Sequence, residues 1–319
     1  MTRIGDSHLD VFPLNLGGNV FGFTADRDAS FAVLDAFAAA GGNFIDTADS
    51  YSSWAPGNSG GESEAIIGEW MELRGNRDRM IVATKVSQHP DRRGLSPENV
   101  ARACEDSLRR LRTDRIDLYY AHFDDPDVPL ADTLAAFDRL VKAGKARYLA
   151  GSNYAPARIE EALAIQAREG LERWVALQPH YNLVERDEYE NGGRRAIAER
   201  ENLGVMPYYS LAAGFLTGKY RDESDLGKSP RGGGAAAYLN EGGLRVLAAL
   251  DRVASGRGVE PASIAIAWLL AQPTVTAPVA SARDAAQLDA LLAGVELELT
   301  ADELGLLDRG QGTADHRPS

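Results

Sequence analysis

The stretch Met80-Ile81-Val82-Ala83-Thr84-Lys85 is a short apolar run that ends in a lysine, and it decides the fold together with two runs of the same design. Asn43-Phe44-Ile45-Asp46 ends in an aspartate, and Ile116-Asp117-Leu118-Tyr119-Tyr120-Ala121-His122 ends in a histidine. Short apolar runs that alternate with amphipathic segments indicate parallel strands joined by helices. Because such folds build their sites at the carboxyl ends of the strands, we expect the three end residues to meet there, together with Tyr51 from the loop after Asp46.

Eight strand candidates alternate with helical segments along the chain. They centre near residues 15, 44, 82, 118, 148, 175, 206 and 276, and Ser96-Pro97-Glu98 is a typical helix start between two of them. Eight strands that are each followed by a helix predict an α/β fold of the (β/α)8 TIM-barrel type. A doubly wound sheet is the rival architecture. It normally carries G-x-G-x-x-G after its first strand, which Gly17-Gly18-Asn19-Val20-Phe21-Gly22 does not match.

Composition sets several bounds on the protein. A length of 319 residues is typical of one such barrel, so we expect a single domain over residues 1–319 with a polar tail from about residue 309. The formal charge of -13 argues against nucleic acid and anionic membranes as partners. Cys104 is the only cysteine, which excludes an intrachain disulfide and a thiolate metal cluster. The sequence has no signal-peptide pattern and no 18-residue apolar run, so we expect a cytoplasmic protein. Its oligomeric state stays open.

The four side chains at the strand ends suggest proton transfer to an oxygen atom. A tyrosine hydroxyl has a pKa of about 10, and a nearby ammonium such as that of Lys85 lowers this pKa by favouring the phenolate. A carboxylate such as that of Asp46 can hold the ammonium in place, so removing either partner is expected to raise the pKa of Tyr51. A histidine beside the phenol can donate to a carbonyl oxygen. None of these groups supplies a hydride, so the chemistry requires a redox cofactor.

Five motifs, in order along the chain, resemble those of the aldo-keto reductase family. Three of them surround the residues above: Asp46-Thr47-Ala48-Asp49-Ser50-Tyr51, Ala83-Thr84-Lys85, and Asp117-Leu118-Tyr119-Tyr120-Ala121-His122. The other two, Gly151-Ser152-Asn153-Tyr154 and Gln178-Pro179-His180-Tyr181-Asn182, match the family's nicotinamide-binding strands. The resemblance extends from about residue 11 to about residue 290.

This resemblance implies NADPH-dependent reduction of an aldehyde or ketone. Tyr51 would be the proton donor, Lys85 and Asp46 would tune it, and His122 would orient the carbonyl oxygen. Trp54 and Phe123 are expected as walls of the substrate pocket, which loops near residues 20–25, 52–60 and 123–128 would shape. The substrate itself stays open between aliphatic and aromatic aldehydes, keto-sugars and methylglyoxal.

The resemblance also implies an extended nicotinamide cofactor site. Tyr208 would stack on the nicotinamide ring, and Arg283 would pair with a 2′-phosphate, which favours NADP(H) over NAD(H). Two departures from the family are Tyr209-Ser210, in the place of a Ser-Pro pair, and Leu291, in the place of a frequent asparagine. The expected cofactor-binding residues are Gly18, Asn19, Asp46, Ser152, Asn153, Gln178, Tyr208, Tyr209, Ser210, Leu211, Ala212, Gly214, Lys219, Arg231, Ser281, Arg283 and Gln287.

A long connection follows the seventh strand. From Ser210 to about Gly243 the chain is rich in glycine, alanine and charge, and long connections in compact domains are commonly functional. The resemblance implies a loop that folds over the cofactor pyrophosphate.

Two other function classes compete with a reductase. One is a non-enzymatic NADP(H)-binding regulatory subunit of the same fold, because some family members resemble channel subunits. The other is a metal-dependent barrel enzyme such as a sugar isomerase. His122 is followed by Asp124, Asp125 and Asp127, but no second cluster with metal-ligand spacing exists, so we expect no metal site. His180 could line the pocket or be structural.

Overall fold

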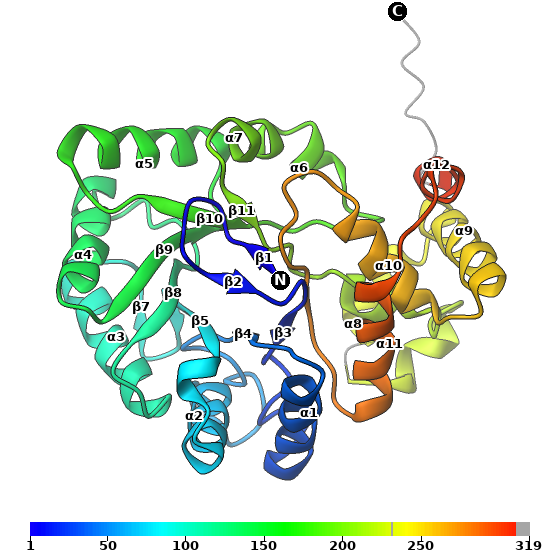
Figure 1. Ribbon diagram of the computed structural model, residues 1–319, viewed down its shortest axis with the longest axis horizontal. Coiled ribbons are helices and arrows are strands. Elements are labelled where there is room, and N and C mark those ends of the chain that lie inside the picture. Colours follow the sequence, from blue (N-terminus) through cyan, green and yellow to red (C-terminus); the bar gives the residue numbers. More distant parts are fainter. Residues whose placement is uncertain (231, 311–319) are drawn as a thin grey trace, which may run out of the picture.

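The computed structural model describes residues 1–230 and 232–310, and its main feature is a parallel sheet that curls into a barrel (Figure 1). The strands lie in sequence order, and the last one, β12, pairs with the first, β3. This confirms the predicted α/β barrel, because a doubly wound sheet would leave its first strand in the interior of an open sheet. The strands are β3 (Asn15–Gly17), β4 (Phe44–Asp46), β5 (Ile81–Val86), β8 (Ile116–Ala121), β9 (Ala146–Ser152), β10 (Trp174–Gln178), β11 (Gly204–Val205) and β12 (Val279–Ala280).

The barrel closes between β11 and β12 through separate hydrogen bonds. The amide of Val279 donates to the carbonyl of Pro207, and the amide of Thr276 donates to the carbonyl of Val205, both at 2.8 Å. Pro207 and Pro278 have no amide hydrogen, so a continuous ladder cannot form here. The last two strands are short, and the eighth lies at residues 279–280, where it pairs with β3, rather than around the expected residue 276.

Helices form the outer layer of the barrel (Figure 1). The predicted helix start at Ser96 is confirmed, since its hydroxyl accepts a hydrogen bond from the amide of Asn99 at 3.2 Å and the helix runs from Pro97. The helices are α1 (Arg27–Ala39), α2 (Glu62–Arg74), α3 (Pro97–Arg110), α4 (Leu130–Lys142), α5 (Pro156–Glu169), α6 (Asp187–Glu190), α7 (Arg194–Arg200), α9 (Glu241–Arg257), α10 (Pro261–Leu270), α11 (Ala285–Glu296) and α12 (Ala301–Gly310).

The amino-terminal hairpin seals one end of the barrel. Its strands β1 (Thr2–Arg3) and β2 (Asp10–Val11) lie across the barrel axis in Figure 1. Ile4 and Leu9, which are buried, pack in one cluster with barrel residues such as Phe44. Because this end is filled with apolar side chains, a site can open only at the carboxyl ends of the strands.

The long connection after β11 consists mainly of helical turns. These are η2 (Ala212–Thr217), η3 (Glu223–Lys228), α8 (Gly232–Ala235) and η4 (Ala236–Tyr238). Phe215, Leu216 and Tyr220 from this segment are fully buried, which anchors it to the barrel. A second insertion in the barrel follows β5 and is a hairpin of β6 (Gln88–His89) and β7 (Arg92–Arg93).

A polar tail was expected from about residue 309, but the chain is still helical there. Arg309 and Gly310 are the last residues of α12, and residues 311–319 lie outside the described part. Among the helices of the described residues, none combines the length and the apolar character needed to cross a lipid bilayer.

Candidate active site

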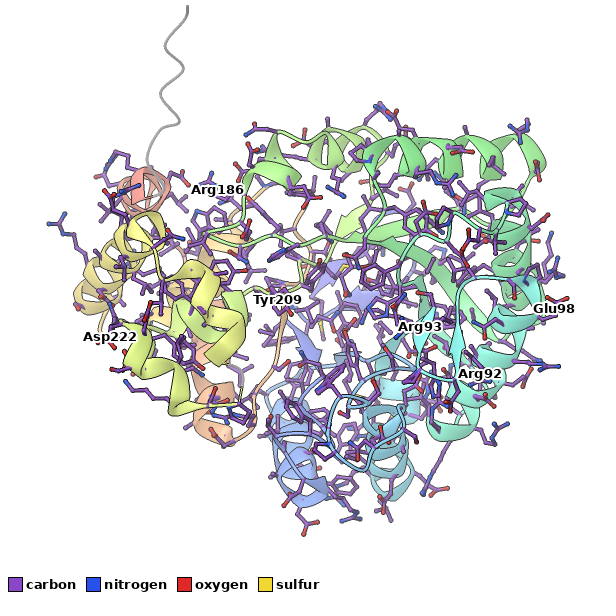
Figure 2. The ribbon with its side chains drawn as sticks, turned by 180° about the vertical axis from the view of Figure 1, so that it is seen from behind. Arg92, Arg93, Glu98, Arg186, Tyr209 and Asp222 are labelled. Carbon is purple, nitrogen blue, oxygen red and sulfur yellow. The ribbon has the colours of Figure 1, made fainter. Side chains whose placement is uncertain are left out.

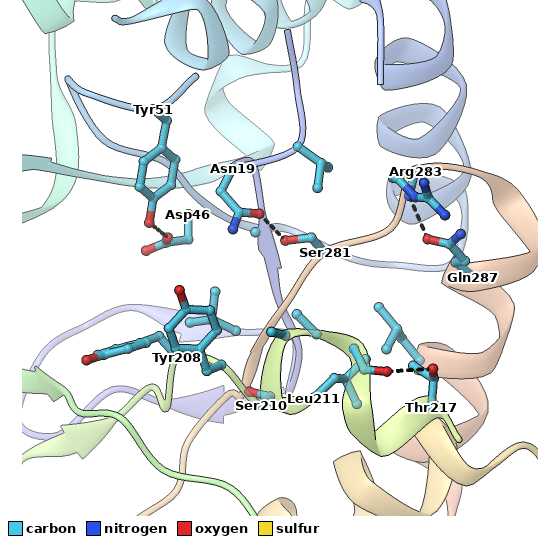
Figure 3. Close-up of a pocket in the computed structure, with 18 of the residues that line it drawn as sticks. Asn19, Asp46, Tyr51, Tyr208, Ser210, Leu211, Thr217, Ser281, Arg283 and Gln287 are labelled. Atoms are coloured by element: carbon cyan, nitrogen blue, oxygen red, sulfur yellow. Dashed lines mark hydrogen bonds between the residues drawn. The ribbon is translucent and has the colours of Figure 1, made fainter. Parts of the chain in front are cut away.

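A cavity of about 810 Å³ opens at the carboxyl ends of the strands and extends toward α10 and α11 (Figure 3). It brings together side chains that are far apart in the sequence, with Tyr51 at one end and Arg283 at the other. The residues expected from the sequence that line it are Asn19, Asp46, Tyr51, Trp54, His122, Phe123, Ser152, Asn153, Gln178, Tyr208, Tyr209, Ser210, Leu211, Gly214, Lys219, Ser281, Arg283 and Gln287.

Three expected site residues do not line the cavity, and a fourth is not among the described residues. Lys85 is fully buried beneath the cavity and reaches it only through its hydrogen-bond partners. Gly18 packs against Ser63, because a Cβ at this position would lie 2.6 Å from the Ser63 hydroxyl oxygen. Ala212 is buried and does not line the cavity. Arg231 lies outside the described residues.

The Lys85 ammonium connects the polar groups at the end of the cavity that contains Tyr51, which we call the reactive end. Its Nζ donates to Asp46 Oδ2 at 2.6 Å, to the Thr47 carbonyl at 2.8 Å and to the Tyr51 hydroxyl at 2.9 Å. β4 and β5 are neighbouring parallel strands, which is why residues 39 positions apart meet. All three donors of the ammonium are therefore used, and one of them reaches the phenol directly.

The Asp46 carboxylate is held from two sides. Oδ2 accepts from Lys85, and Oδ1 accepts from the side-chain amide of Gln178 at 2.8 Å. Asp46 and Gln178 are almost fully buried, so each hydrogen bond replaces water that the group lost on folding. The Tyr51 hydroxyl also lies 3.3 Å from Oδ2, which completes a compact arrangement of three ionisable groups.

The pKa of Tyr51 is raised well above the ordinary value for tyrosine. Burial is the main cause, and the Asp46 carboxylate adds to it because a second negative charge beside it disfavours the phenolate. The net direction is thus opposite to the lowering expected from Lys85. The direct effect of the Asp46 carboxylate is to raise this pKa, whereas its expected effect through the charge of Lys85 stays a prediction. Tyr51 consequently carries its proton at neutral pH, as a proton donor requires.

His122 contributes a neutral imidazole beside the phenol. Burial and the nearby Lys85 charge hold its pKa well below the ordinary value for histidine. Its ring lies edge-on to Tyr51, with 6.2 Å between the ring centroids. Nδ1 is buried without a hydrogen-bond partner among the described residues. A neutral imidazole keeps one N–H, which can be donated to a carbonyl oxygen in the cavity.

The ends of β9 and β10 carry a connected set of amide and hydroxyl groups. The Ser152 hydroxyl donates to the Gln178 carbonyl at 2.9 Å, and Asn153 Nδ2 donates to the His122 carbonyl at 3.0 Å. The Tyr208 hydroxyl donates to Asn153 Oδ1 at 2.8 Å, which positions the Tyr208 ring opposite Tyr51 across the cavity (Figure 3). A flat ring bound between these residues would have both a stacking surface and amide partners.

His180 has a structural position beneath this surface. Its ring is stacked on that of Tyr208, with centroids 5.2 Å apart and planes 15° apart, and it does not line the cavity. Of the two roles that the sequence left open, this geometry is that of a support for Tyr208.

The other end of the cavity presents positive charge and apolar walls. Lys219 and Arg283 line it, and neither forms an ion pair within the described residues. The Arg283 amide donates to Gln287 Oε1 at 3.2 Å, and the Ser281 hydroxyl donates to Asn19 Oδ1 at 2.6 Å. Two cations without an ion pair among the described residues, in an extended cavity, fit a ligand with several phosphate charges, such as a dinucleotide. The apolar residues here are Ala262, Ala286, Ala290 and Leu291.

The acidic residues after His122 have other partners. Asp124 forms a two-pronged ion pair with Arg158 at 2.8 and 2.9 Å. Asp125 accepts from the amides of Leu95 and Asp127. Within residues 1–230 and 232–310, no group of three or more histidine, cysteine or acidic side chains is arranged to hold a metal ion.

Several lining residues were not anticipated. Val20 and Ser53 belong to loops that the sequence analysis expected to shape the pocket, and Leu291 to the expected adenine end. Ser50 is next to Tyr51 in the sequence, which is a weak local signal. The other lining residues were not anticipated one by one, and they are Gly17, Gln88, Ala213, Thr217, Ser229, Glu260, Ala262, Val279, Ala280, Ala286 and Ala290.

Comparisons with known proteins agree with this geometry. The model of the Aldo/keto reductase family matches residues 13–310. The chain is 31% identical to Protein tas of Escherichia coli (strain K12), over 96% of each chain. It is 32% identical to an aryl-alcohol dehydrogenase (NADP+) of Phanerodontia chrysosporium, over 94% of this chain and 82% of the relative. It is 31% identical to a probable voltage-gated potassium channel subunit beta of Oryza sativa subsp. japonica, over 88% and 86%.

Proposed function

This chain belongs to the aldo/keto reductase family, and on that premise we propose that it reduces an aldehyde or ketone to an alcohol with NADPH as the hydride donor. The family, together with relatives named as dehydrogenases and reductases, makes the chain an oxidoreductase. The observation that carries the finer proposal is the direct contact of Lys85 with both Asp46 and Tyr51, at 2.6 and 2.9 Å, under the floor of the cavity.

Proton transfer is the part of the reaction that these residues perform. A substrate carbonyl oxygen near Tyr51 accepts hydrogen bonds from the phenol and from the His122 N–H. The hydride that the carbonyl carbon accepts would come from a reduced nicotinamide bound in the cavity. Negative charge then develops on the oxygen, and Tyr51 transfers its proton there, which yields the alcohol. The phenolate left behind is stabilised by the Lys85 ammonium, whose charge Asp46 keeps in place.

Cofactor binding would use the whole length of the cavity. Tyr208 offers a stacking face, and Ser152 and Asn153 offer polar atoms to a carboxamide. Lys219 and Arg283 would bind phosphate groups, and a 2′-phosphate beside Arg283 gives the preference for NADPH over NADH. The name of the Phanerodontia chrysosporium relative, an aryl-alcohol dehydrogenase (NADP+), supports this choice.

A non-enzymatic role as a nicotinamide-binding subunit is the second candidate. The relative from rice whose name is that of a potassium channel subunit beta favours it. The two candidates differ in one measurable property, because both bind cofactor but only a reductase turns it over.

The test is NADPH oxidation against a panel of aldehydes and ketones, together with cofactor titration by protein fluorescence. Turnover of at least one carbonyl compound supports the reductase. Tight NADPH binding without turnover on the panel supports the subunit. Loss of turnover after treatment with a chelator would contradict both and favour a metal-dependent enzyme.

A further inference from the structure

The reactive end of the cavity is walled by aromatic side chains that are unusually exposed. Trp54, Phe123 and Tyr209 are 51%, 41% and 46% exposed, and all three line the cavity. They make up half of the six large hydrophobic residues that are exposed within the described part of the chain. Large apolar side chains that are left open to water and gathered on one cavity indicate a binding surface.

Two of these walls are held in place by other rings. Trp54 packs edge-on to Phe23, with centroids 6.1 Å apart, and lies 5.9 Å from the ring of Tyr51. Phe123 lies 5.0 Å from the ring of His122. The walls thus contact the same two residues that would hold the carbonyl oxygen, so a bound ring would be positioned with its carbonyl toward them.

The third wall, Tyr209, has an unusual backbone. Its φ is 54°, in the left-handed region that bulky side chains rarely adopt. Its carbonyl accepts from Ala212 N at 2.7 Å and from Asn182 Nδ2 at 2.9 Å, and these bonds hold the strained turn. A disfavoured backbone that its surroundings hold in place is a common feature of functional sites.

This turn directs the Tyr209 ring to the cavity. The ring packs at 5.4 Å from Tyr208 and at 5.2 Å from His180. It is close enough to Tyr51 that its phenol is among the groups that raise the pKa of Tyr51. Figure 2 shows Tyr209 between the barrel and the helical turns that follow β11. A glycine or asparagine would adopt this backbone with less strain. We therefore infer that the aromatic side chain at position 209 has a use that outweighs the strain.

Among the described residues, the reactive end offers no free charge to a substrate. Asp46 lines it, but its oxygens are taken by Lys85 and Gln178. His122 is neutral because its pKa is lowered. The lining cation Arg283 lies at the opposite end in Figure 3. An ionised group on the substrate would lose water here without gaining a partner.

We propose that Tyr209 is a specificity-determining residue that, with Trp54 and Phe123, selects neutral carbonyl compounds whose carbonyl is attached to a flat aromatic ring. This inference rests on the proposed carbonyl reduction and names its substrate class. Tyr209 is also among the residues expected to bind the cofactor, so its contribution to specificity is measured as the ratio of kcat/KM between two substrates at saturating NADPH.

The test compares benzaldehyde with cyclohexanecarbaldehyde, which has a saturated ring of similar size, and with 2-carboxybenzaldehyde, which carries a charge. Tyr209→Asn and Tyr209→Gly remove the ring and keep a residue suited to the backbone, whereas Tyr209→Phe keeps the ring. Loss of an aromatic contact reduces the preference for benzaldehyde over cyclohexanecarbaldehyde in kcat/KM by about three- to tenfold in the first two variants. Tyr209→Phe retains the preference.

Leu73→Asn is the matched control. Leu73 is an exposed large hydrophobic residue on α2 outside the cavity, so this substitution leaves the preference unchanged. An unchanged preference in both ring-deleted variants, with fluorescence titration showing normal cofactor binding, would overturn the role of Tyr209. Equal kcat/KM for 2-carboxybenzaldehyde and benzaldehyde would overturn the selection of neutral substrates.

Experiments on the wild-type protein distinguish failure of this inference from failure of the proposed carbonyl reduction. If it reduces none of the three aldehydes, their binding is measured by saturation-transfer NMR in the presence of NADPH. Benzaldehyde binding that is weakened in Tyr209→Asn would then support the aromatic site without the reaction. Binding of benzaldehyde that is absent, or equal in the two proteins, would overturn the inference.

Discussion

The Lys85 ammonium donates a hydrogen bond to the Tyr51 hydroxyl at 2.9 Å, although these residues are 34 positions apart and come from different βα units. Lys85 is fully buried, and among the described residues the negative charge in direct contact with it is Asp46. Burial disfavours the charged form of Lys85, and the Asp46 carboxylate opposes this effect. The Tyr51 hydroxyl is therefore held beside a buried ion pair.

Replacing Tyr51 with phenylalanine tests the proton donor. The variant loses the transferable proton but keeps the ring, so turnover is expected to fall by about 10²–10⁴-fold while cofactor affinity is nearly unchanged. Steady-state rates on the best carbonyl substrate, with NADPH titrated by protein fluorescence, provide the measurement. Near-wild-type turnover would remove Tyr51 from the mechanism.

Replacing Asp46 with asparagine tests the electrostatics of the same group. Tyr51 must be protonated to act, so activity is lost as pH rises through its pKa. The Asp46 carboxylate raises that pKa. A neutral amide removes this effect, and the alkaline limb of the pH–rate profile is expected to move to lower pH. A limb that moves to higher pH would show instead that Asp46 acts mainly through the charge of Lys85.

Replacing Arg283 with alanine tests cofactor choice. A guanidinium pairs with a 2′-phosphate, and the ribose hydroxyl of NADH carries no charge for it. Loss of this contact is expected to cost about 1.5–3 kcal/mol, or roughly ten- to more than a hundredfold in NADPH affinity, with little change for NADH. Arg252→Ala, on the exposed surface of α9, is the matched control. Equal wild-type affinities for the two cofactors, or a ratio that Arg283→Ala does not change, would contradict the NADP assignment.

The buried carboxyl group of Asp49, in the loop between Asp46 and Tyr51, is expected to make the free energy of unfolding depend on pH. Burial and the neighbouring Glu64 carboxylate raise its pKa from 3.8 to about 7, which the charges of Arg110 and Arg92 partly offset. Between these two pH values the folded protein holds a proton that the unfolded chain has released. This residue therefore makes the free energy of unfolding fall as pH rises, by at most about 1.4 kcal/mol per pH unit.

The measurement is urea unfolding of wild type and Asp49→Asn at several pH values from about 4 to 8. The asparagine cannot titrate, so its advantage over wild type is expected to grow across this interval and to level off above about pH 7. Asp91→Asn, an exposed residue, is the control and is expected to follow wild type. A constant difference between wild type and Asp49→Asn would mean that Asp49 titrates normally in the folded protein.

The barrel and the chemistry at its strand ends could be predicted because both are local patterns. Apolar runs that end in Asp46, Lys85 and His122 indicate strands and mark their carboxyl ends, and parallel pairing then brings those ends together. The position of the eighth strand was less predictable. Pro207 and Pro278 limit the hydrogen bonds between the last two strands, and that limit matters only once the strands are neighbours.

The sequence by itself determined which chemical groups are available and on which strand each one sits, because side-chain identity and hydrophobic period are properties of the chain. Only the tertiary structure decided what state those groups are in. The pKa of Tyr51 is raised mainly because the fold buries it, and that of His122 is lowered by burial and by the charge of Lys85 from the neighbouring strand. The strained turn that directs Tyr209 to the cavity depends in the same way on Asn182, 27 residues earlier in the chain. Burial and long-range contacts set these properties, and neither is encoded in any short stretch of sequence.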